Sequence, residues 1–197
     1  MIIKQSAAPD VEPVSVDEVK SQLVWCGDAD DTLISSMIPV ARQIAEQRTG
    51  RAFITQSWDR WYDAFPAQIV LPWAPLQSIT AVTYTDIDGD IQTLDTSVYT
   101  ADSDSEPGRV YLGYGQSWPS TRCMKKAVKV SYVAGFGDAA EDVPAQLRLA
   151  IMLLVGSLLN NREDDAPLQL HKVPWGVEQM LADYKMYRPV DCVCWVH

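Results

Sequence analysis

The sequence has few of the residues on which most catalytic sites depend. It contains 2 histidines and 4 cysteines in 197 residues. Only His171 and His197 could act as imidazole bases, and neither lies in a recognisable arrangement with a nucleophile and an orienting group. Four cysteines cannot form a disulfide framework for a chain of this length. A soluble enzyme would therefore need a site assembled from distant residues, which is the alternative function that the sequence leaves open.

Nucleotide and metal motifs are also incomplete. The glycines of GYG and GFG lack the third glycine of a dinucleotide fingerprint, and no phosphate-binding loop is present. DIDGD at residues 86–90 begins like a calcium loop, but Ser97 stands where a bidentate glutamate is required. Cys192, Cys194 and His197 offer three zinc ligands without a fourth nearby. We expect no cofactor, and a metal-binding module is part of the same alternative.

Long apolar runs and excess positive charge are scarce as well. The most apolar run, LRLAIMLLVGSLL at residues 147–159, is shorter than the roughly 20 residues of a membrane span and contains Arg148. We expect a buried helix there and no membrane partner. The N-terminus lacks the apolar segment of a secretory signal. A formal charge of -10 argues against a protein that grips nucleic acid, because such binding depends on clustered lysine and arginine.

Apolar periodicity instead predicts helices at both ends of the chain. Ser15 and Glu18 form a capping box before a short helix, and a second helix runs from about Leu33 to a terminal Gly50. Pro39 lies inside the second helix and should kink it. Two more helices begin at Pro144 and near Trp175. Between these ends, alternating patterns predict strands at 53–63, 68–71, 77–85, 91–94, 97–101, 109–112 and 127–133.

Segregated helices and strands predict an α+β fold. We expect a small helical bundle formed by both chain ends, with an inserted antiparallel β-rich subdomain. The expected boundaries are 1–52 for the N-terminal helices, 53–135 for the inserted subdomain, 136–188 for the C-terminal helices and 189–197 for an extended arm.

Large aromatic residues gather early in the β-rich region. Trp58, Trp61 and Trp73 are the candidate interface residues, because tryptophan is enriched where proteins bind each other. The competing interpretation is a packed sheet face inside the subunit.

The C-terminal segment VDCVCWVH is apolar on both faces of an extended chain. Pro189 ends the preceding helix, so residues 190–197 should leave the bundle as a strand-like arm. We expect the arm to dock on a partner by adding a strand, with Trp195 as the anchor. The alternative is an arm folded back on its own subunit. The residues of the arm that would make contact are Val190, Cys192, Val193, Cys194, Trp195, Val196 and His197.

The order of the motifs resembles the head–tail connector family of long-tailed bacteriophages, also called adaptor or head-completion proteins. The motifs are VSVDEVKSQL, DDTLISSMIPVARQIAEQRTGRAFITQSWD, LPWAPLQSITAVTYTDIDG, SEPGRVYL with a following SWP, VSYVAGFGD and VPAQLRLAIMLLVGSLLNNRE. The resemblance covers roughly residues 13–185 and rests on the order and spacing of these segments.

The resemblance implies a structural protein of the virion neck and no enzymatic activity. Members of the family form rings, typically dodecamers, that dock beneath the portal after DNA packaging and carry the stopper or the tail. The expected partners are therefore the portal protein, a stopper or other neck protein, further copies of the chain, and passing DNA that is not bound sequence-specifically. The expected location is the virion neck, and the host cytoplasm during assembly. An acidic channel wall agrees with this role, since every phosphate contact would resist sliding.

Overall fold

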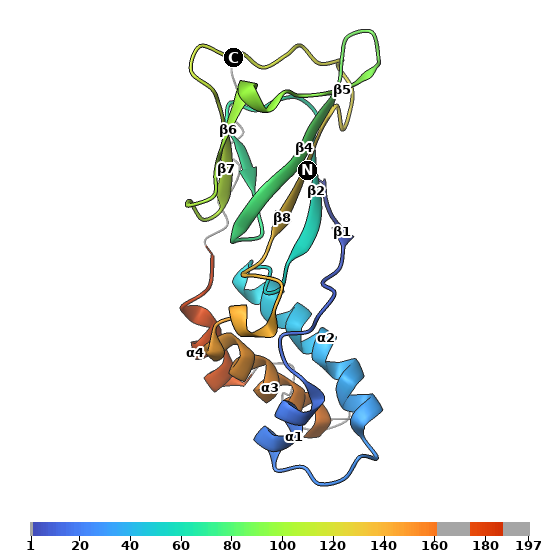
Figure 1. The fold of residues 1–197 in the computed structure, drawn as a ribbon, viewed down its shortest axis with the longest axis vertical. Coiled ribbons are helices and arrows are strands. Elements are labelled where there is room, and N and C mark those ends of the chain that lie inside the picture. Colours follow the sequence, from blue (N-terminus) through green and yellow to red (C-terminus); the bar gives the residue numbers. More distant parts are fainter. Residues whose placement is uncertain (1, 161–173, 187–197) are drawn as a thin grey trace.

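The computed structural model describes residues 2–160 and 174–186. The molecule is elongated, with its helices at one end and its two sheets at the other (Figure 1). The helices are α1 (Val16–Leu23), α2 (Asp31–Thr49), α3 (Ala145–Asn160) and α4 (Trp175–Ala182), with short 3-10 turns η1 (Thr96–Val98) and η2 (Ala140–Asp142). The α+β class predicted from the sequence is confirmed.

Local sequence signals account for the helix ends. The Ser15 hydroxyl accepts the Glu18 N–H at 3.2 Å, and the Glu18 carboxylate accepts the Ser15 N–H at 2.8 Å, which completes the predicted capping box. Helix α2 ends at Gly50, whose φ of 75° is the left-handed conformation that glycine adopts at little cost. Helix α2 continues without a break through Pro39.

The helices share one apolar core built from both ends of the chain. Its buried members come from all four helices and from the segments beside them. Helix α3 lies at its centre, with Leu147, Ala150 and Ile151 fully buried. Helix α4 contributes its two buried residues, Val177 and Leu181, to the same core. The first helices therefore depend on the last ones for cover.

The β part contains two antiparallel sheets with a second core between them. The five-stranded sheet has the order β1-β2-β8-β4-β5, and the three-stranded sheet has the order β3-β7-β6. Their bounds are β1 Ile2–Ala7, β2 Gln56–Tyr62, β3 Ile69–Leu71, β4 Leu76–Thr85, β5 Ile91–Thr93, β6 Tyr99–Asp102, β7 Gly108–Leu112 and β8 Val128–Ala134. Residues of both sheets, such as Tyr132 and Val110, meet in this core.

Strand β1 is a departure from the predicted boundaries. The sequence assigned residues 1–52 to helices, whereas Ile2–Ala7 pairs antiparallel with β2 and forms an edge of the five-stranded sheet. Five of its six residues are exposed, so the strand has no buried face that would produce an alternating pattern. The inserted subdomain is therefore completed by the start of the chain.

The helical and β parts join at a narrow crossing of backbone segments. Gly135, at the end of β8, has a φ of 148°, and a Cβ there would lie 2.6 Å from the Thr55 nitrogen. Only glycine allows the two backbones to approach this closely. Arg51 bridges the same region, donating from Nε to the Tyr184 carbonyl at 2.7 Å and pairing with Glu106.

Candidate functional site

The structure separates the three candidate interface tryptophans. Trp58 is 9% exposed and belongs to the core between the sheets. Its ring stacks on that of Trp73, with centroids 4.5 Å apart and planes 14° from parallel. Trp73 is held in a left-handed conformation, at a φ of 72°. This pair therefore stabilises the subunit from within, and an interface role for it stays untested.

Trp61 faces the other side of the five-stranded sheet. Strand residues alternate in direction, so Trp61 points away from the face to which Trp58 and Arg60 contribute. The strand register places Trp61 in one row across all five strands. The row contains Ile2, Trp61, Lys129, Thr83 and Thr93.

Two lysines lie over the Trp61 ring. The ammonium groups of Lys126 and Lys129 are each 5.8 Å from its centroid, within the range of a cation–π contact. The Lys129 ammonium also pairs with Asp59 at 3.0 Å. Lys126 adopts a left-handed φ of 61°, and the Asp63 carboxylate accepts its N–H at 2.9 Å. The segment before β8 is thus fixed in a conformation that brings positive charge to Trp61.

A cavity of about 310 Å³ opens beside this tryptophan. It is lined by Ile2, Trp61, Tyr62, Asp63, Lys125 and Lys126. The lining combines apolar surface from Ile2 and the Trp61 ring with two lysines and one carboxylate, Asp63. Trp61 was predicted from the sequence as an interface residue, whereas the lysines beside it were not. The signal in the sequence was the Lys125–Lys126 pair shortly before the strand predicted at 127–133.

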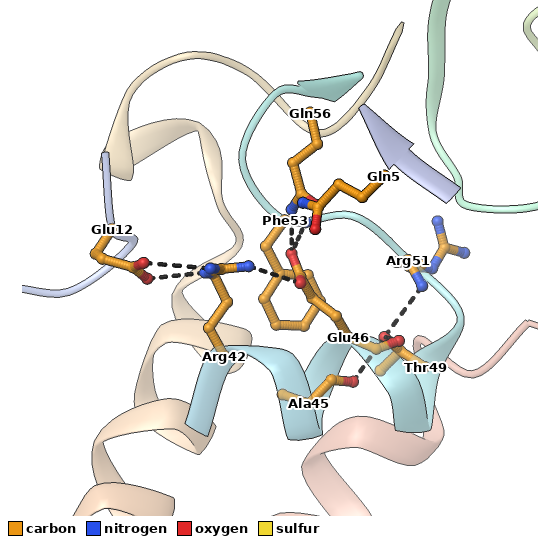
Figure 2. A network of polar contacts seen from close by, with 9 residues as sticks. All are labelled: Gln5, Glu12, Arg42, Ala45, Glu46, Thr49, Arg51, Phe53 and Gln56. Carbon is orange, nitrogen blue, oxygen red and sulfur yellow. Dashed lines mark hydrogen bonds and ion pairs between the residues drawn. The ribbon is translucent and has the colours of Figure 1, made fainter. Parts of the chain in front are cut away.

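A buried polar network ties the helices to the sheet (Figure 2). Arg42 pairs with Glu46 and with Glu12, each at 2.8 Å. The Glu46 carboxylate also accepts the Phe53 N–H at 2.9 Å and the Gln56 amide at 2.6 Å. Burial raises the pKa of Glu46, opposed by Arg42 and by these hydrogen bonds. Arg42 and Glu46 belong to α2 and Gln56 begins β2, so the network joins the helical part to the β part.

The described residues include no cluster of three or more histidine, cysteine, aspartate or glutamate side chains placed to hold a metal. Asp86, the first residue of the calcium-like segment, accepts the N–H groups of Gly89 and Asp90, both at 2.9 Å, and so closes a hairpin turn. Within residues 2–160 and 174–186, no helix is long and apolar enough to cross a membrane. The arm residues 190–197, including the possible zinc ligands, lie outside the described part of the chain.

Solved structures share this fold over nearly the whole chain. A chain in the neck of an empty gene transfer agent particle, computed with C6 symmetry, has a TM-score of 0.80. Its sequence is 22% identical, and the alignment covers 97% of this chain and 98% of that one. The chain thus has the same fold as that neck chain. The resemblance to head–tail connectors is thus confirmed at the level of the fold.

Two further structures agree with this assignment. A chain in the virion of the native gene transfer agent has a TM-score of 0.79, and one in the native neck computed with C12 symmetry has 0.77. Both are 22% identical, with 97% of this chain and 98% of that chain covered. Neither a protein-family model nor a curated protein sequence matches the chain.

Proposed function

We propose that the chain is a structural subunit of a virion neck, acting as an adaptor ring that docks on the portal after DNA packaging and joins the head to the stopper or tail. The observation that carries this proposal is the fold match to the particle neck, with a TM-score of 0.80 over 97% of the chain. The match includes both the helical end and the β part, so it covers the complete arrangement of the subunit.

A ring of copies is the oligomer that fits the neck. The similar neck structures were computed with C6 and C12 symmetry. Cyclic assembly uses two different surfaces of each subunit, and the elongated shape offers long flanks for such contacts (Figure 1). We propose a dodecamer around the DNA channel.

The charge of the chain suits a channel through which DNA must move. Each copy carries a formal charge of -10, and a ring multiplies it. Phosphates close to an acidic wall are repelled and are not held by ion pairs. Passing DNA would therefore slide without sequence-specific contacts.

The C-terminal arm is the proposed portal contact. Residues 190–197 would add a strand to the portal, with Trp195 buried as the anchor. Burial of one indole contributes on the order of 2 to 3 kcal/mol, and a ring of arms multiplies weak contacts through avidity. The last described residues lie against the helix bundle, where the Met186 N–H donates to the Thr49 carbonyl at 2.7 Å.

The test uses DNA-filled heads that lack the neck. Full-length protein should form a ring at the portal vertex, visible by electron microscopy, and restore the joining of tails. Deletion of residues 190–197 should abolish attachment while leaving the melting temperature nearly unchanged.

Single substitutions give a matched comparison for the arm. Trp195→Ala should weaken attachment, whereas Trp175→Ala, at a residue that is 76% exposed on α4, should not. Wild-type protein that neither binds heads nor assembles on the portal would overturn the proposed function. A truncated protein that completes heads normally would overturn only the arm.

A further inference from the structure

Val24, at the end of α1, combines backbone strain with exposure. Its φ of 52° lies in the left-handed region, which a β-branched residue rarely adopts and in which glycine is the usual residue at a helix end. The side chain is 86% exposed, so almost none of its apolar surface is buried within the subunit. Val24 therefore lowers the stability of the fold at a position where glycine would not.

Two other residues with a positive φ have contacts that offset their strain. Trp73 stacks on Trp58, and the Lys126 N–H is accepted by the Asp63 carboxylate. The Val24 side chain instead extends into solvent. Backbone strain of this kind is typical of functional sites.

The loop after α1 holds Val24 in a fixed position. The Trp25 N–H donates to the Lys20 carbonyl at 2.9 Å, which closes the end of the helix. The Lys20 ammonium then pairs with Asp28 at 2.7 Å and with Asp31 at 2.8 Å, and so ties the loop to the start of α2. A surface that is already ordered loses little entropy when it binds a partner.

The loop between α1 and α2 forms the far end of the helical part (Figure 1). Helix α2 leads from this tip to the junction with the β part, over about 28 Å for its 19 residues. The described chain ends at the junction, where the Met186 N–H donates to the Thr49 carbonyl. From there to Trp195 a fully extended chain spans at most about 30 Å. Only an arm turned back along all of α2 would bring Trp195 level with the tip, so the arm and the tip suit different partners.

The tip is acidic, as is the helical part behind it. The loop and the start of α2 carry Asp28, Asp30 and Asp31, with Lys20 as the cation that pairs with two of them. In residues 8–50, 136–160 and 174–186, acidic residues outnumber basic ones by 13 to 5. DNA and the equally acidic tip of a second copy would both be repelled. The chemistry that fits is an apolar pocket with a basic rim on a different protein.

We propose that the tip, formed by Val24 and the loop to Asp31, docks in an apolar, basic-rimmed pocket of the protein that follows the ring on the tail side. This inference rests on the proposed function, in which the arm takes the portal side. It gives the strained, exposed valine a role that the isolated subunit does not provide.

Substitutions at Val24 separate folding from docking. Val24→Gly and Val24→Asn accept the left-handed conformation and should raise the melting temperature of the free subunit by about 2 to 4 °C. Both remove the apolar side chain, so rings that carry them should join tails at least about tenfold less efficiently. Val24→Ile keeps the apolar surface and should join tails normally. The control is Val11→Asn, at a residue that is 48% exposed, which should leave tail joining unchanged.

Ala29 provides a test of the partner's charge. It is exposed in the same loop, between Asp28 and Asp30. Ala29→Lys should lower tail joining, because the added ammonium would meet a basic rim, whereas Ala29→Glu should join tails at least as well as wild type. Equal effects of the two variants would overturn the basic-rimmed partner and with it the inference.

Two native cysteines report the contact directly. Cys26 lies in the tip loop, Cys123 lies in the loop before β8, and both are exposed. Cys26 should react with a maleimide in the free subunit and in rings on DNA-filled heads, and should become protected when tails are joined. Cys123 should react equally before and after tails are joined. Mass spectrometry of the labelled peptides distinguishes the two sites.

The outcomes separate this docking surface from the ring itself. Cys26 that stays reactive after tails are joined, or Val24→Gly rings that join tails normally, would overturn the inference and leave the proposed function standing. Protection of Cys26 in the free subunit would show that the chain itself covers the tip. Protection on heads alone would show that the portal or a second copy covers it, and either result overturns the inference. Wild-type protein that forms no ring on heads overturns both proposals.

Discussion

The helical and β parts obtain their cores in different ways. The helical core combines residues separated by more than a hundred positions, such as Val19 and Ile151. The β core is drawn from residues between Ala52 and Ala134, with β1 added at the sheet edge. The helical end is thus a scaffold that requires both ends of the chain, whereas the β part can vary its hairpins without disturbing the bundle.

A single charge in the helical core should cause the largest effect. Leu154 in α3 is 4% exposed, and Leu154→Asp would bury an unpaired carboxylate at a cost of several kcal/mol. We expect α1 and α2 to unfold with α3, which circular dichroism and urea unfolding would show. The control is Val40→Asp on α2, at a residue that is 47% exposed. Wild-type helicity and a single normal transition in Leu154→Asp would contradict the shared core.

Within the β part, the two faces of β2 should respond differently. Trp58→Ala would leave a cavity beside Trp73 and cost about 3 to 5 kcal/mol. Trp61→Ala removes a side chain from the outer face and should change the free energy of unfolding by about 1 kcal/mol or less. Chemical denaturation of the two variants measures the difference. Equal losses would show that the outer face contributes to the fold as the core does.

The capping box provides a smaller effect confined to the helical end. Ser15→Ala removes the acceptor for the Glu18 N–H and should cost about 1 kcal/mol. Ser21→Ala, an exposed position inside α1, is the control and should be neutral or slightly stabilising. Thermal unfolding distinguishes them, and indistinguishable melting temperatures would argue that α1 is held by packing alone.

The junction between the parts should show the smallest effect, a change with pH. Burial raises the pKa of Glu46 above its ordinary value of 4.5, so the folded state holds this proton to higher pH than the unfolded state. The contribution of Glu46 to stability therefore falls as pH rises from 4.5 through the folded pKa. Glu46→Gln removes this dependence, and its stability relative to wild type should increase with pH.

Glu18 supplies the opposite case for the same measurement. The hydrogen bond from the Ser15 backbone is the largest cause that lowers the pKa of Glu18. Its contribution is present above pH 4.5 and is lost as pH falls through the folded value. The stability of Glu18→Gln relative to wild type should thus decrease with pH. Urea unfolding between about pH 4 and pH 8 checks both signs. Parallel trends in the two variants would refute the assigned directions.

Much of the fold could be predicted because its signals are local. Capping at Ser15, termination at Gly50 and the alternation of β8 each depend on neighbouring residues. Strand β1 could not be predicted, because its order comes from pairing with β2 and it carries no buried face. The pairing of β1 with β2 therefore determines a strand that the periodicity of the sequence does not reveal.

The candidate site was predictable only in part. The spacing of three between Trp58 and Trp61 already places them on opposite faces of a strand, but not which face is buried. That choice depends on where the three-stranded sheet packs. The left-handed conformation of Lys126 and its bond to Asp63 are likewise tertiary features, so the lysines around Trp61 emerge only in the folded chain.

The position where the described chain ends bears on how force would enter the subunit. At the junction of the two parts, the Arg51 side chain donates a hydrogen bond to the Tyr184 carbonyl, and the Met186 N–H donates to the Thr49 carbonyl. If the segment beyond carries a partner, tension on it is delivered at the waist of the molecule, through Arg51 to Glu106 in the β part and through Thr49 to α2. Force on the C-terminal segment would then act on both parts at once. Neither core would have to unfold from one end.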